Sequence, residues 1–191
     1  MRTMVNDLLD VARLESGQKE RALSPVNLSE IASLCLDGYG QEAAARRITL
    51  ELAAPESVPF VGDRGELDIV LNNLVSNAVK YNRDGGRVTV RIAQETGGRT
   101  AIQVTDTGIG LSSEEMSRLF REFSRIQNDK TRQVPGSGLG LSILKRIASR
   151  YGGDVTVASE PDVGSTFTVT LVPVDPASAA ALAFPGASTS D

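Results

Sequence analysis

Histidine and tryptophan are absent from the 191-residue sequence, and cysteine occurs once. Without histidine, the chain cannot hold a histidine-ligated zinc ion, a Ser-His-Asp triad or a histidine general base. The single cysteine, Cys35, cannot form a disulfide within the chain, and its apolar neighbours predict a thiol buried in the core. These absences exclude three common kinds of catalytic site and are compatible with a reducing compartment.

Long hydrophobic runs and an excess of basic charge are also missing. No run approaches the roughly 20 apolar residues that span a bilayer, and no signal peptide opens the sequence, so we expect a soluble protein. The net charge is −4 and the basic residues are scattered, which predicts that nucleic acid is not a partner. Hydrophobic residues make up 40% and aromatic residues 4% of the chain, as in an ordinary aliphatic globular core.

The length of the chain suits one well-buried domain with an appendage. Residues 1–17 carry an apolar stripe at helical spacing and predict an amphipathic helix that ends near Gly17. Residues 18–26 are polar, contain a proline and predict a linker. A folded domain is expected over residues 27–173, and residues 174–191, rich in Ala, Ser, Pro and Gly, are predicted to be a disordered tail.

Within residues 27–173, helical and alternating hydrophobic patterns follow one another. Helices are predicted at about 27–45, 64–81 and 139–150, with one short helix between residues 111 and 135. Strands are predicted at 48–52, 58–61, 88–92, 102–104, 155–157 and 167–171. Hairpin-like strand pairs indicate a mixed, mostly antiparallel sheet covered on one face by helices, which is an α/β (α+β) two-layer sandwich.

A polar stripe runs along the predicted helix at 64–81, beside its buried stripe. It consists of Asn73, Asn77, Lys80 and Tyr81, which share one face at i, i+4, i+7 and i+8. One interpretation is a solvated face with aligned amides. The other is functional, because amide oxygens suit Mg²⁺ and a lysine meets phosphate as a point charge. This helix alone leaves both interpretations open.

Asp106 ends a predicted strand and is followed by Gly108 and Gly110. Asp and Gly are common turn residues, so the stretch can be only a turn. Alternatively, Asp106 can accept a hydrogen bond from an exocyclic amino group such as that of adenine, while the glycines let the backbone approach a ligand.

Gly136, Gly138 and Gly140 precede the predicted helix at 139–150. A glycine-rich turn at a helix N-terminus offers free N–H groups and a positive dipole end to an anion. The stretch is neither a P-loop, which requires Lys and then Ser or Thr, nor a dinucleotide fingerprint, which requires glycine where Leu141 stands. The polar loop between Gly110 and Gly136 has the composition of a mobile lid.

Five motifs in this order resemble the boxes of one known domain. Asn73–Tyr81, Asp106–Gly110, Phe120–Phe123, Gly136–Leu141 and Gly164–Thr166 are similar to the N, G1, F, G2 and third glycine boxes. These boxes mark the catalytic and ATP-binding domain of sensor histidine kinases, in the GHKL superfamily. The resemblance covers residues 1–172 and implies a Bergerat-type ATP-binding fold. It also identifies residues 1–17 with the second helix of the dimerisation and histidine phosphotransfer domain.

The resemblance assigns roles in binding ATP and Mg²⁺. It implies that Asn77 coordinates Mg²⁺, that Asn73 lies by the terminal phosphate, and that Arg125 approaches the transferring phosphoryl group, so that Asn73 and Arg125 are the catalytic candidates. Lys80 would contact phosphate, Tyr81 would pack near the nucleotide, and Asp106 would bind the adenine amino group. Phe120 and Phe123 would anchor the lid. The remaining expected ATP contacts are Gly108, Gly110, Gly136, Ser137, Gly138, Leu139, Gly140, Leu141 and Thr166.

The reaction expected from the resemblance is transfer of the ATP γ-phosphoryl group to a histidine, for relay to a response-regulator aspartate. DNA gyrase B, mismatch-repair ATPases and a heat-shock chaperone carry a water-activating Glu four residues before the Mg-binding Asn. Here Asn73 stands at that position, and an amide cannot act as the general base. Hydrolysis is therefore disfavoured, and transfer to a protein acceptor, which depends on positioning and charge neutralisation, is expected instead.

The chain has no histidine, so the acceptor must lie outside it. We expect the chain to begin inside the dimerisation domain, to belong to a homodimer in the full-length protein, and to work with a response-regulator receiver domain. A cytoplasmic location is expected, with membrane anchoring of the full-length protein left open. Two alternatives remain: a degenerate nucleotide-binding or scaffolding module, and an anti-sigma-type serine kinase, against which the dimerisation helix at the N-terminus argues.

Overall fold

Five strands form the main sheet of the computed structural model, which describes residues 21–119 and 138–174. The strands are β2 (Thr49–Ala53), β4 (Arg87–Gln94), β5 (Thr100–Asp106), β6 (Asp154–Glu160) and β7 (Gly164–Leu171). Their spatial order is β2-β4-β5-β7-β6. In these described residues β2 and β4 are parallel and the other neighbours are antiparallel, which confirms the predicted mixed, mostly antiparallel sheet.

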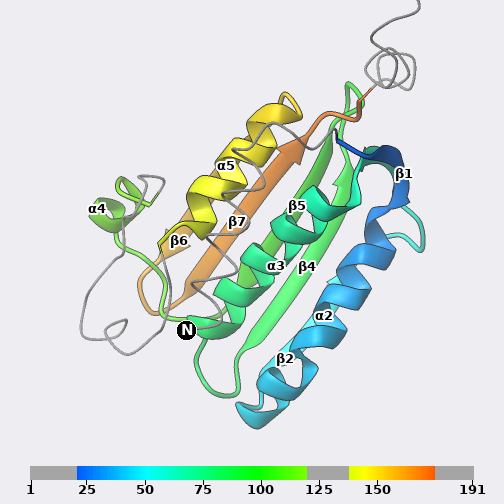
Figure 1. The fold of residues 1–191 in the computed structure, drawn as a ribbon. Coiled ribbons are helices and arrows are strands. Elements are labelled where there is room, and N and C mark those ends of the chain that lie inside the picture. The colour runs from blue at the N-terminus through cyan, green and yellow to red at the C-terminus, as the bar shows by residue number, and fades with distance from the viewer. Residues whose placement is uncertain (1–20, 120–137, 175–191) are drawn as a thin grey trace, which may run out of the picture.

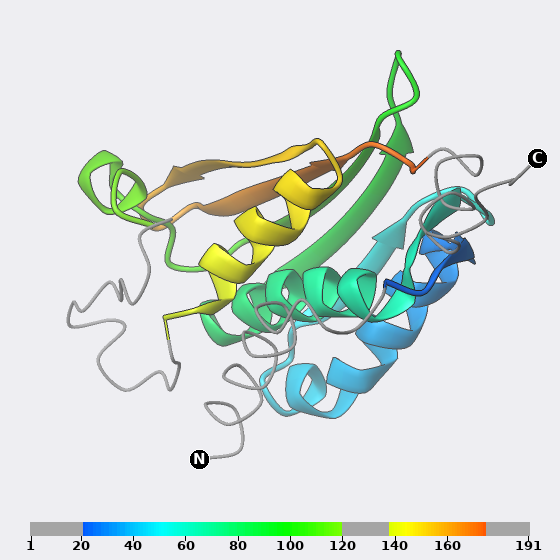
Figure 2. The same ribbon diagram turned by 45° about the horizontal axis from the view of Figure 1, so that its top comes forward.

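Three long helices cover one face of this sheet (Figures 1 and 2). They are α2 (Leu28–Ala45), α3 (Arg64–Lys80) and α5 (Gly140–Arg150), and a single-turn helix, α4 (Ser113–Met116), follows β5. Asn27 caps α2 by accepting from Ser29 N, and Asp63 caps α3 by accepting from Glu66 N. The predicted two-layer sandwich is confirmed. Within the described residues, no helix combines the length and apolar character needed to cross a bilayer.

The core lies between the helices and the sheet. The predicted apolar stripe of α3 is at most 3% exposed; it consists of Leu67, Val70, Leu71, Leu74 and Ala78. It packs with buried residues of β4 and β5 such as Val90 and Ile102, while alternate strand residues such as Thr89 face the other side of the sheet. Cys35 is buried as expected, and desolvation, with a smaller effect of Asp68, raises the pKa of its thiol to about 12.

Residues Leu23–Asn27 form strand β1, where the sequence predicts part of a linker. β1 pairs antiparallel with β3 (Pro59–Asp63) in a separate two-stranded sheet. The linker prediction is wrong for these residues because Pro25, which reads as a strand breaker, is tolerated in a strand that has a neighbour on one side only. The predicted helix at 1–17, the rest of the linker up to residue 20 and the tail from residue 175 lie outside the described residues.

Arg21, just before β1, is held at the ends of α3 and α5. Its Nη2 atom lies 2.7 Å from Glu66 Oε2, and Arg150 Nη1 lies 2.9 Å from Glu66 Oε1. The Arg21 guanidinium also lies 4.4 Å from the ring centroid of Tyr151, the residue that follows α5. The chain therefore enters the domain anchored to the N-terminal end of α3 and the C-terminal end of α5.

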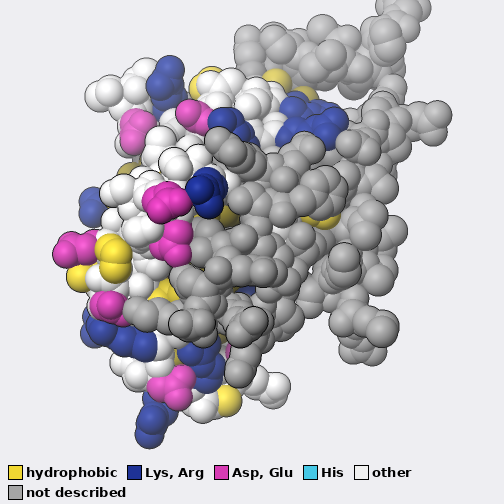
Figure 3. Space-filling model, turned by 90° about the vertical axis from the view of Figure 1, so that its left-hand side faces the viewer, with side chains coloured by type: hydrophobic (Ala, Val, Ile, Leu, Met, Phe, Trp, Pro, Cys, Tyr) yellow, Lys and Arg dark blue, Asp and Glu magenta, His cyan; other side chains and the backbone are white. Residues whose placement is uncertain are grey.

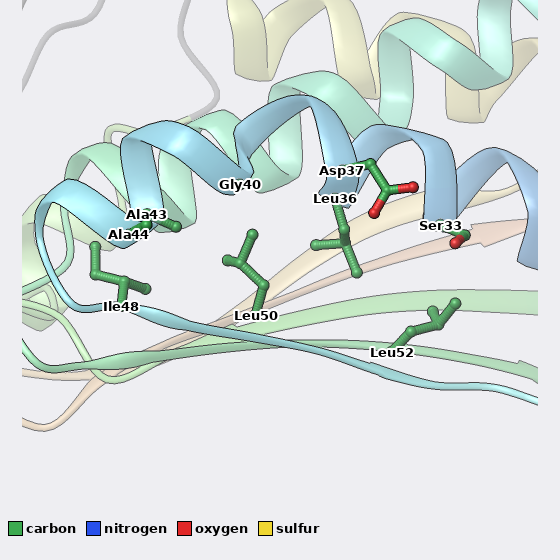
Figure 4. A pocket seen from close by; sticks show the side chains of 9 residues that line it. All are labelled: Ser33, Leu36, Asp37, Gly40, Ala43, Ala44, Ile48, Leu50 and Leu52. Atoms are coloured by element: carbon green, nitrogen blue, oxygen red, sulfur yellow. The ribbon is translucent and has the colours of Figure 1, made fainter.

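A groove of about 470 Å³ lies between α2 and the edge strand β2 (Figure 4). It is lined by Ser33, Leu36, Asp37, Gly40, Ala43, Ala44, Ile48, Leu50 and Leu52. No residue that the sequence assigns to ATP or Mg²⁺ is among them. The groove is therefore separate from the candidate site described below.

Replacing Gly38 with alanine should stabilise the protein. Gly38 lies inside α2, and a Cβ atom there would meet nothing within 4 Å. Because glycine weakens a helix interior, the free energy of unfolding should rise by about 0.5–1 kcal/mol in urea denaturation. Gly153→Ala is the matched control and should destabilise, since its Cβ would overlap the backbone carbonyl of Thr170. A Gly38→Ala protein no more stable than the parent would contradict a continuous helix through residue 38.

Candidate functional site

The polar stripe of α3 approaches the N-terminus of α5. Asn73, Asn77, Lys80 and the C-capping residue Tyr81 are all partly buried. Asn73 Nδ2 donates to the Ile69 carbonyl of its own helix at 2.9 Å. Its Oδ1 atom lies against α5, because a Cβ atom on Gly140 would overlap it. The structure thus brings together Asn73 and Gly140, which the sequence predicts from two separate motifs.

Leu139 is the N-cap residue of α5, and its own side chain makes no capping hydrogen bond. Gly138 before it has φ of +77°, in the left-handed region that favours glycine. The first N–H groups of a helix and its positive dipole end together attract anions. This helix start, next to Asn73, therefore has the chemistry to receive phosphate oxygens.

Asn77 lies one turn after Asn73 on α3. Its side chain makes no hydrogen bond with the described residues. Nor do these residues contain a group of three or more His, Cys, Asp or Glu side chains that could hold a metal ion. A metal ion here would depend on an amide oxygen, on phosphate and on water, and this donor set suits Mg²⁺, which keeps several waters and few protein ligands.

The C-terminal end of α3 is fixed by Arg46, which sequence reasoning missed. Arg46 Nη1 donates to the Val79 carbonyl at 2.7 Å and Nη2 to the Asn82 carbonyl at 2.6 Å. A cation that satisfies the last carbonyls of a helix is doubly favourable there. Asn82 is itself buried and donates to the Arg87 carbonyl at 3.0 Å, which ties the end of α3 to the start of β4. These contacts hold Lys80 and Tyr81 in place.

Asp106 ends β5 and is only 7% exposed. The Gly108 N–H donates to its Oδ1 atom at 2.8 Å. Burial raises the pKa of the Asp106 carboxyl to about 6, while backbone hydrogen bonds from Gly108 and Ser165 act in the opposite direction. At neutral pH the group is therefore mainly a buried carboxylate, and its unused acceptor sites suit a ligand that donates hydrogen bonds.

Gly108 and Gly110 allow the chain after Asp106 to pass close to two other segments. A Cβ atom on Gly108 would overlap the Tyr81 carbonyl, and Ile109 N donates to that carbonyl at 3.1 Å. Gly110 has φ of +62°, and its Cβ would overlap the Glu160 carbonyl. The expected site residues Tyr81, Asp106, Gly108 and Gly110 are therefore brought together, between the end of α3 and the turn from β6 to β7.

Thr166 lies on β7, the strand that pairs with β5 and thus with Asp106. The β5–β7 register pairs Thr105 with Thr166 and Asp106 with Ser165. The hydroxyls of Thr105 and Thr166 lie 3.0 Å apart, on the opposite side of the sheet from Asp106. The Thr166 side chain therefore points away from Asp106, a detail that the motif alone does not give because it depends on strand register. The ATP contact of Thr166 stays a prediction. Ser165, 8% exposed, is the residue beside Asp106.

Several predicted site residues lie outside the described residues. They are Phe120, Phe123, Arg125, Gly136 and Ser137. Of the G2 box, the described part is Gly138 to Leu141, in which Leu139 is buried and Leu141 packs against the core.

Charged side chains are mixed by sign on the face of the molecule shown in Figure 3. Lys and Arg alternate there with Asp and Glu among the described residues, without an extended surface of one sign. Within the candidate site, Lys80 and the start of α5 are groups that can attract phosphate oxygens.

Comparison with known proteins identifies the family. Residues 62–175 match the family model of "Histidine kinase-, DNA gyrase B-, and HSP90-like ATPase". The sensor-like histidine kinase SenX3 of Mycolicibacterium smegmatis is 33% identical over 168 residues, which are 88% of this chain and 44% of that protein. The circadian input-output histidine kinase CikA of Synechococcus elongatus is 36% identical over 182 residues, which are 91% of this chain and 24% of that protein.

Solved structures agree with this assignment. Full-length ShkA in complex with AMPPNP superposes with a TM-score of 0.74 at 30% identity, covering 88% of this chain and 35% of that one. The mycobacterial sensor histidine kinase MprB has a TM-score of 0.67 at 29% identity, covering 80% of this chain and 100% of that one. The chain spans less than half the length of the curated relatives named above. It belongs to the histidine kinase-, DNA gyrase B- and HSP90-like ATPase family, as an ATP-binding catalytic domain of the sensor histidine kinase type.

Proposed function

We propose that this chain is the catalytic unit of a sensor histidine kinase that transfers the γ-phosphoryl group of Mg-ATP to a histidine outside the chain, for relay to a response-regulator aspartate. The observation that carries the proposal is the convergence of α3, the end of β5 and the start of α5. There, Asn73 lies against Gly140 at the N-terminus of α5, Asn77 follows one turn later on α3, and Asp106 lies near the end of α3.

Different residues of the site would bind different parts of the nucleotide. Asp106 would accept from the adenine amino group, with Gly108 and Gly110 shaping the backbone beside it. Tyr81 would pack near the nucleotide, and Lys80 would contact phosphate. The start of α5, from Gly138 to Leu141, would bind phosphate oxygens. In the third glycine box, Ser165 would lie beside the base, because it is the cross-strand partner of Asp106. Thr166 would follow it on the strand nearest the base.

Asn77 is the residue that would hold Mg²⁺, through its unpaired amide oxygen. When bound, Mg²⁺ would neutralise charge on the phosphate oxygens. Asn73 would lie by the terminal phosphate, and Arg125, from the part of the chain not described, would approach the transferring group. The Asn73 amide is already bonded to the Ile69 carbonyl and has no basic site for a water proton, which argues against hydrolysis of the gyrase type.

The proposed partners are a dimerisation and phosphotransfer domain that carries the acceptor histidine, a receiver domain, and a second copy in the full-length protein. Residues 1–17 would be the second helix of that dimerisation domain, and the unit would work in the cytoplasm. Any membrane anchoring of the full-length protein would depend on segments outside this chain. Phosphoryl transfer of this kind requires the chain to position the reactants and to neutralise charge, and it requires no covalent bond to the chain.

Phosphate transfer in trans tests the proposal. The chain is mixed with γ-labelled Mg-ATP and a separately produced polypeptide that carries the parent protein's dimerisation region. We expect acid-labile, base-stable label on that polypeptide and none after its acceptor histidine is replaced with glutamine. Acid-stable label on this chain would instead support a serine kinase. Tight ATP binding without any transfer would support a non-catalytic binding module.

ATP affinity should depend on the ionisation of Asp106. The amino group of adenine forms a stronger hydrogen bond with a carboxylate than with a carboxylic acid. In the ligand-free protein the pKa of the Asp106 carboxyl is about 6. Affinity should therefore fall as the pH drops below about 6, measured with a fluorescent ATP analogue between pH 5 and 8. The ATP phosphates titrate in the same range, so Asp106→Asn is the control that isolates the Asp106 contribution. An identical pH profile in this variant would contradict the assignment.

A further inference from the structure

The hydroxyl of Ser159, in β6, joins three separate segments at the end of the sheet. Its Oγ accepts from Leu111 N at 2.8 Å, donates to the Gly164 carbonyl at 2.9 Å and lies 2.9 Å from Ser165 Oγ. Ser159 is the cross-strand partner of Ser165, and Ser165 is the partner of Asp106. The three side chains therefore form a row across β5, β7 and β6, on the sheet face that is covered by helices.

The contacts of Ser159 determine which hydroxyl donates. A serine hydroxyl has one hydrogen and two acceptor sites. The Gly164 carbonyl can only accept, so the Ser159 hydrogen is used there, and Leu111 N–H fills one acceptor site. In the remaining contact, Ser165 must therefore be the donor to Ser159. The Ser165 hydroxyl hydrogen is therefore used in the bond to Ser159, and the Ser165 oxygen can only accept a hydrogen bond from a ligand.

Ser165 and Asp106 thus present acceptors side by side in a nearly buried place, 8% and 7% exposed. A ligand amino group can donate to such a pair. An exocyclic carbonyl at the same place would meet acceptors only and would leave buried groups unpaired, which disfavours a base that carries one. The hydroxyl of Ser165 could rotate to donate to a carbonyl if Ser159 did not hold it.

We propose that Ser159 is a positioning residue for base selection: by holding Ser165 as an acceptor, it makes the site favour a 6-amino purine over a 6-oxo purine. Ser159 touches no ligand in this scheme and acts through Ser165. The same hydroxyl holds Leu111, at the start of the segment that leads away from the site. The inference rests on the proposed function, since it places the base at Asp106.

The test compares ATP with inosine triphosphate, whose base carries an oxo group in place of the 6-amino group. Dissociation constants of both are measured for the whole chain with Mg²⁺. The unaltered protein should prefer ATP, and Ser159→Ala should reduce the ATP-to-ITP preference by about five- to tenfold. Ser159→Thr keeps the hydroxyl and should restore the preference. Thermal unfolding of each variant reports structural damage separately.

A second variant keeps the test decisive if Ser159→Ala folds poorly. Ser165→Ala removes the acceptor itself and should reduce the preference by a similar factor, and the double variant should lose no more than either single one. An unchanged preference in Ser159→Ala, or equal weakening of both nucleotides, would overturn the inference and leave Ser159 a purely structural role. Absence of ATP binding by the unaltered protein, or full ATP binding by Asp106→Asn, would instead overturn the proposed function.

Discussion

Asp106→Asn is expected to weaken ATP binding by about ten- to a hundredfold. The substitution keeps the size of the side chain and its acceptor for Gly108 N–H, which lies 2.8 Å from Oδ1. It removes the charge and turns part of the acceptor group into a donor that faces the adenine amino group. A hydrogen bond to a charged group contributes about 1.5–3 kcal/mol, which corresponds to this loss of affinity. Isothermal calorimetry at pH 7 measures it, and unchanged affinity would contradict the placement of the base.

The same variant should be more stable than the parent without ligand. In the folded protein the pKa of Asp106 is raised from 3.8 to about 6. The unfolded chain therefore releases this proton first as the pH rises, so the contribution of Asp106 to the free energy of unfolding falls between about pH 4 and pH 6. This loss is on the order of 3 kcal/mol above pH 6. Asparagine has no charge to bury, so it avoids this loss.

Urea denaturation of ligand-free protein at pH 4 and pH 7 measures the stability effect. Asp106→Asn should have the higher free energy of unfolding at pH 7, and the difference should nearly vanish at pH 4. A variant that is less stable than the parent at pH 7 would show that the buried carboxylate is favourably solvated in the free domain. In that case the pKa of Asp106 would not be raised in the free domain, and protonation of Asp106 could not explain a fall in ATP affinity below about pH 6.

Gly110→Ala is expected to damage both the stability of the fold and the site. Alanine is strained at φ of +62°, and its Cβ would overlap the backbone carbonyl of Glu160, which cannot move without displacing β6. The free energy of unfolding should fall by roughly 2–4 kcal/mol, and ATP binding should weaken because the chain after Asp106 shifts.

Gly98→Ala separates the two causes of this effect. Gly98 has φ of +78°, but a Cβ atom there would meet nothing within 4 Å. It should therefore show only the backbone strain, about 1 kcal/mol, and should leave ATP binding unchanged. Urea denaturation and a fluorescent ATP analogue measure both variants. Equal losses of stability at the two positions would contradict the close approach of Gly110 to Glu160.

The sequence predicts the helices and the main-sheet strands because each shows its own hydrophobic period. It also predicts which polar residues of α3 share a face, since Asn73 and Asn77 follow from helical spacing alone. Their function did not follow from spacing, and only the order of several motifs distinguished an ATP site from a solvated face. Asp106 does take part in a turn, since its carboxylate accepts from Gly108 N–H, and its burial is what the sequence does not show.

What the sequence misses depends on contacts between distant segments. Whether Ser165 or Thr166 lies beside Asp106 depends on the register of β7 against β5, and a sequence motif does not specify that register. Arg46 and Ser159 act through partners far away in the chain, so no local pattern marks them. β1 was missed for a different reason, since its five residues include Pro25 and are stabilised only by pairing with β3.

Calorimetric titration of ATP into the whole chain, with and without Mg²⁺, tests most directly whether α3, β5 and α5 form one nucleotide site. We expect binding that is strengthened by Mg²⁺, and we expect Asn77→Ala to remove most of this strengthening. Asp106→Asn should lose affinity with or without the metal. Leu34→Ala, at an exposed position of α2 outside the proposed site, should bind as the parent does. ATP binding that is absent, or that is equal in all of these proteins, would contradict the site.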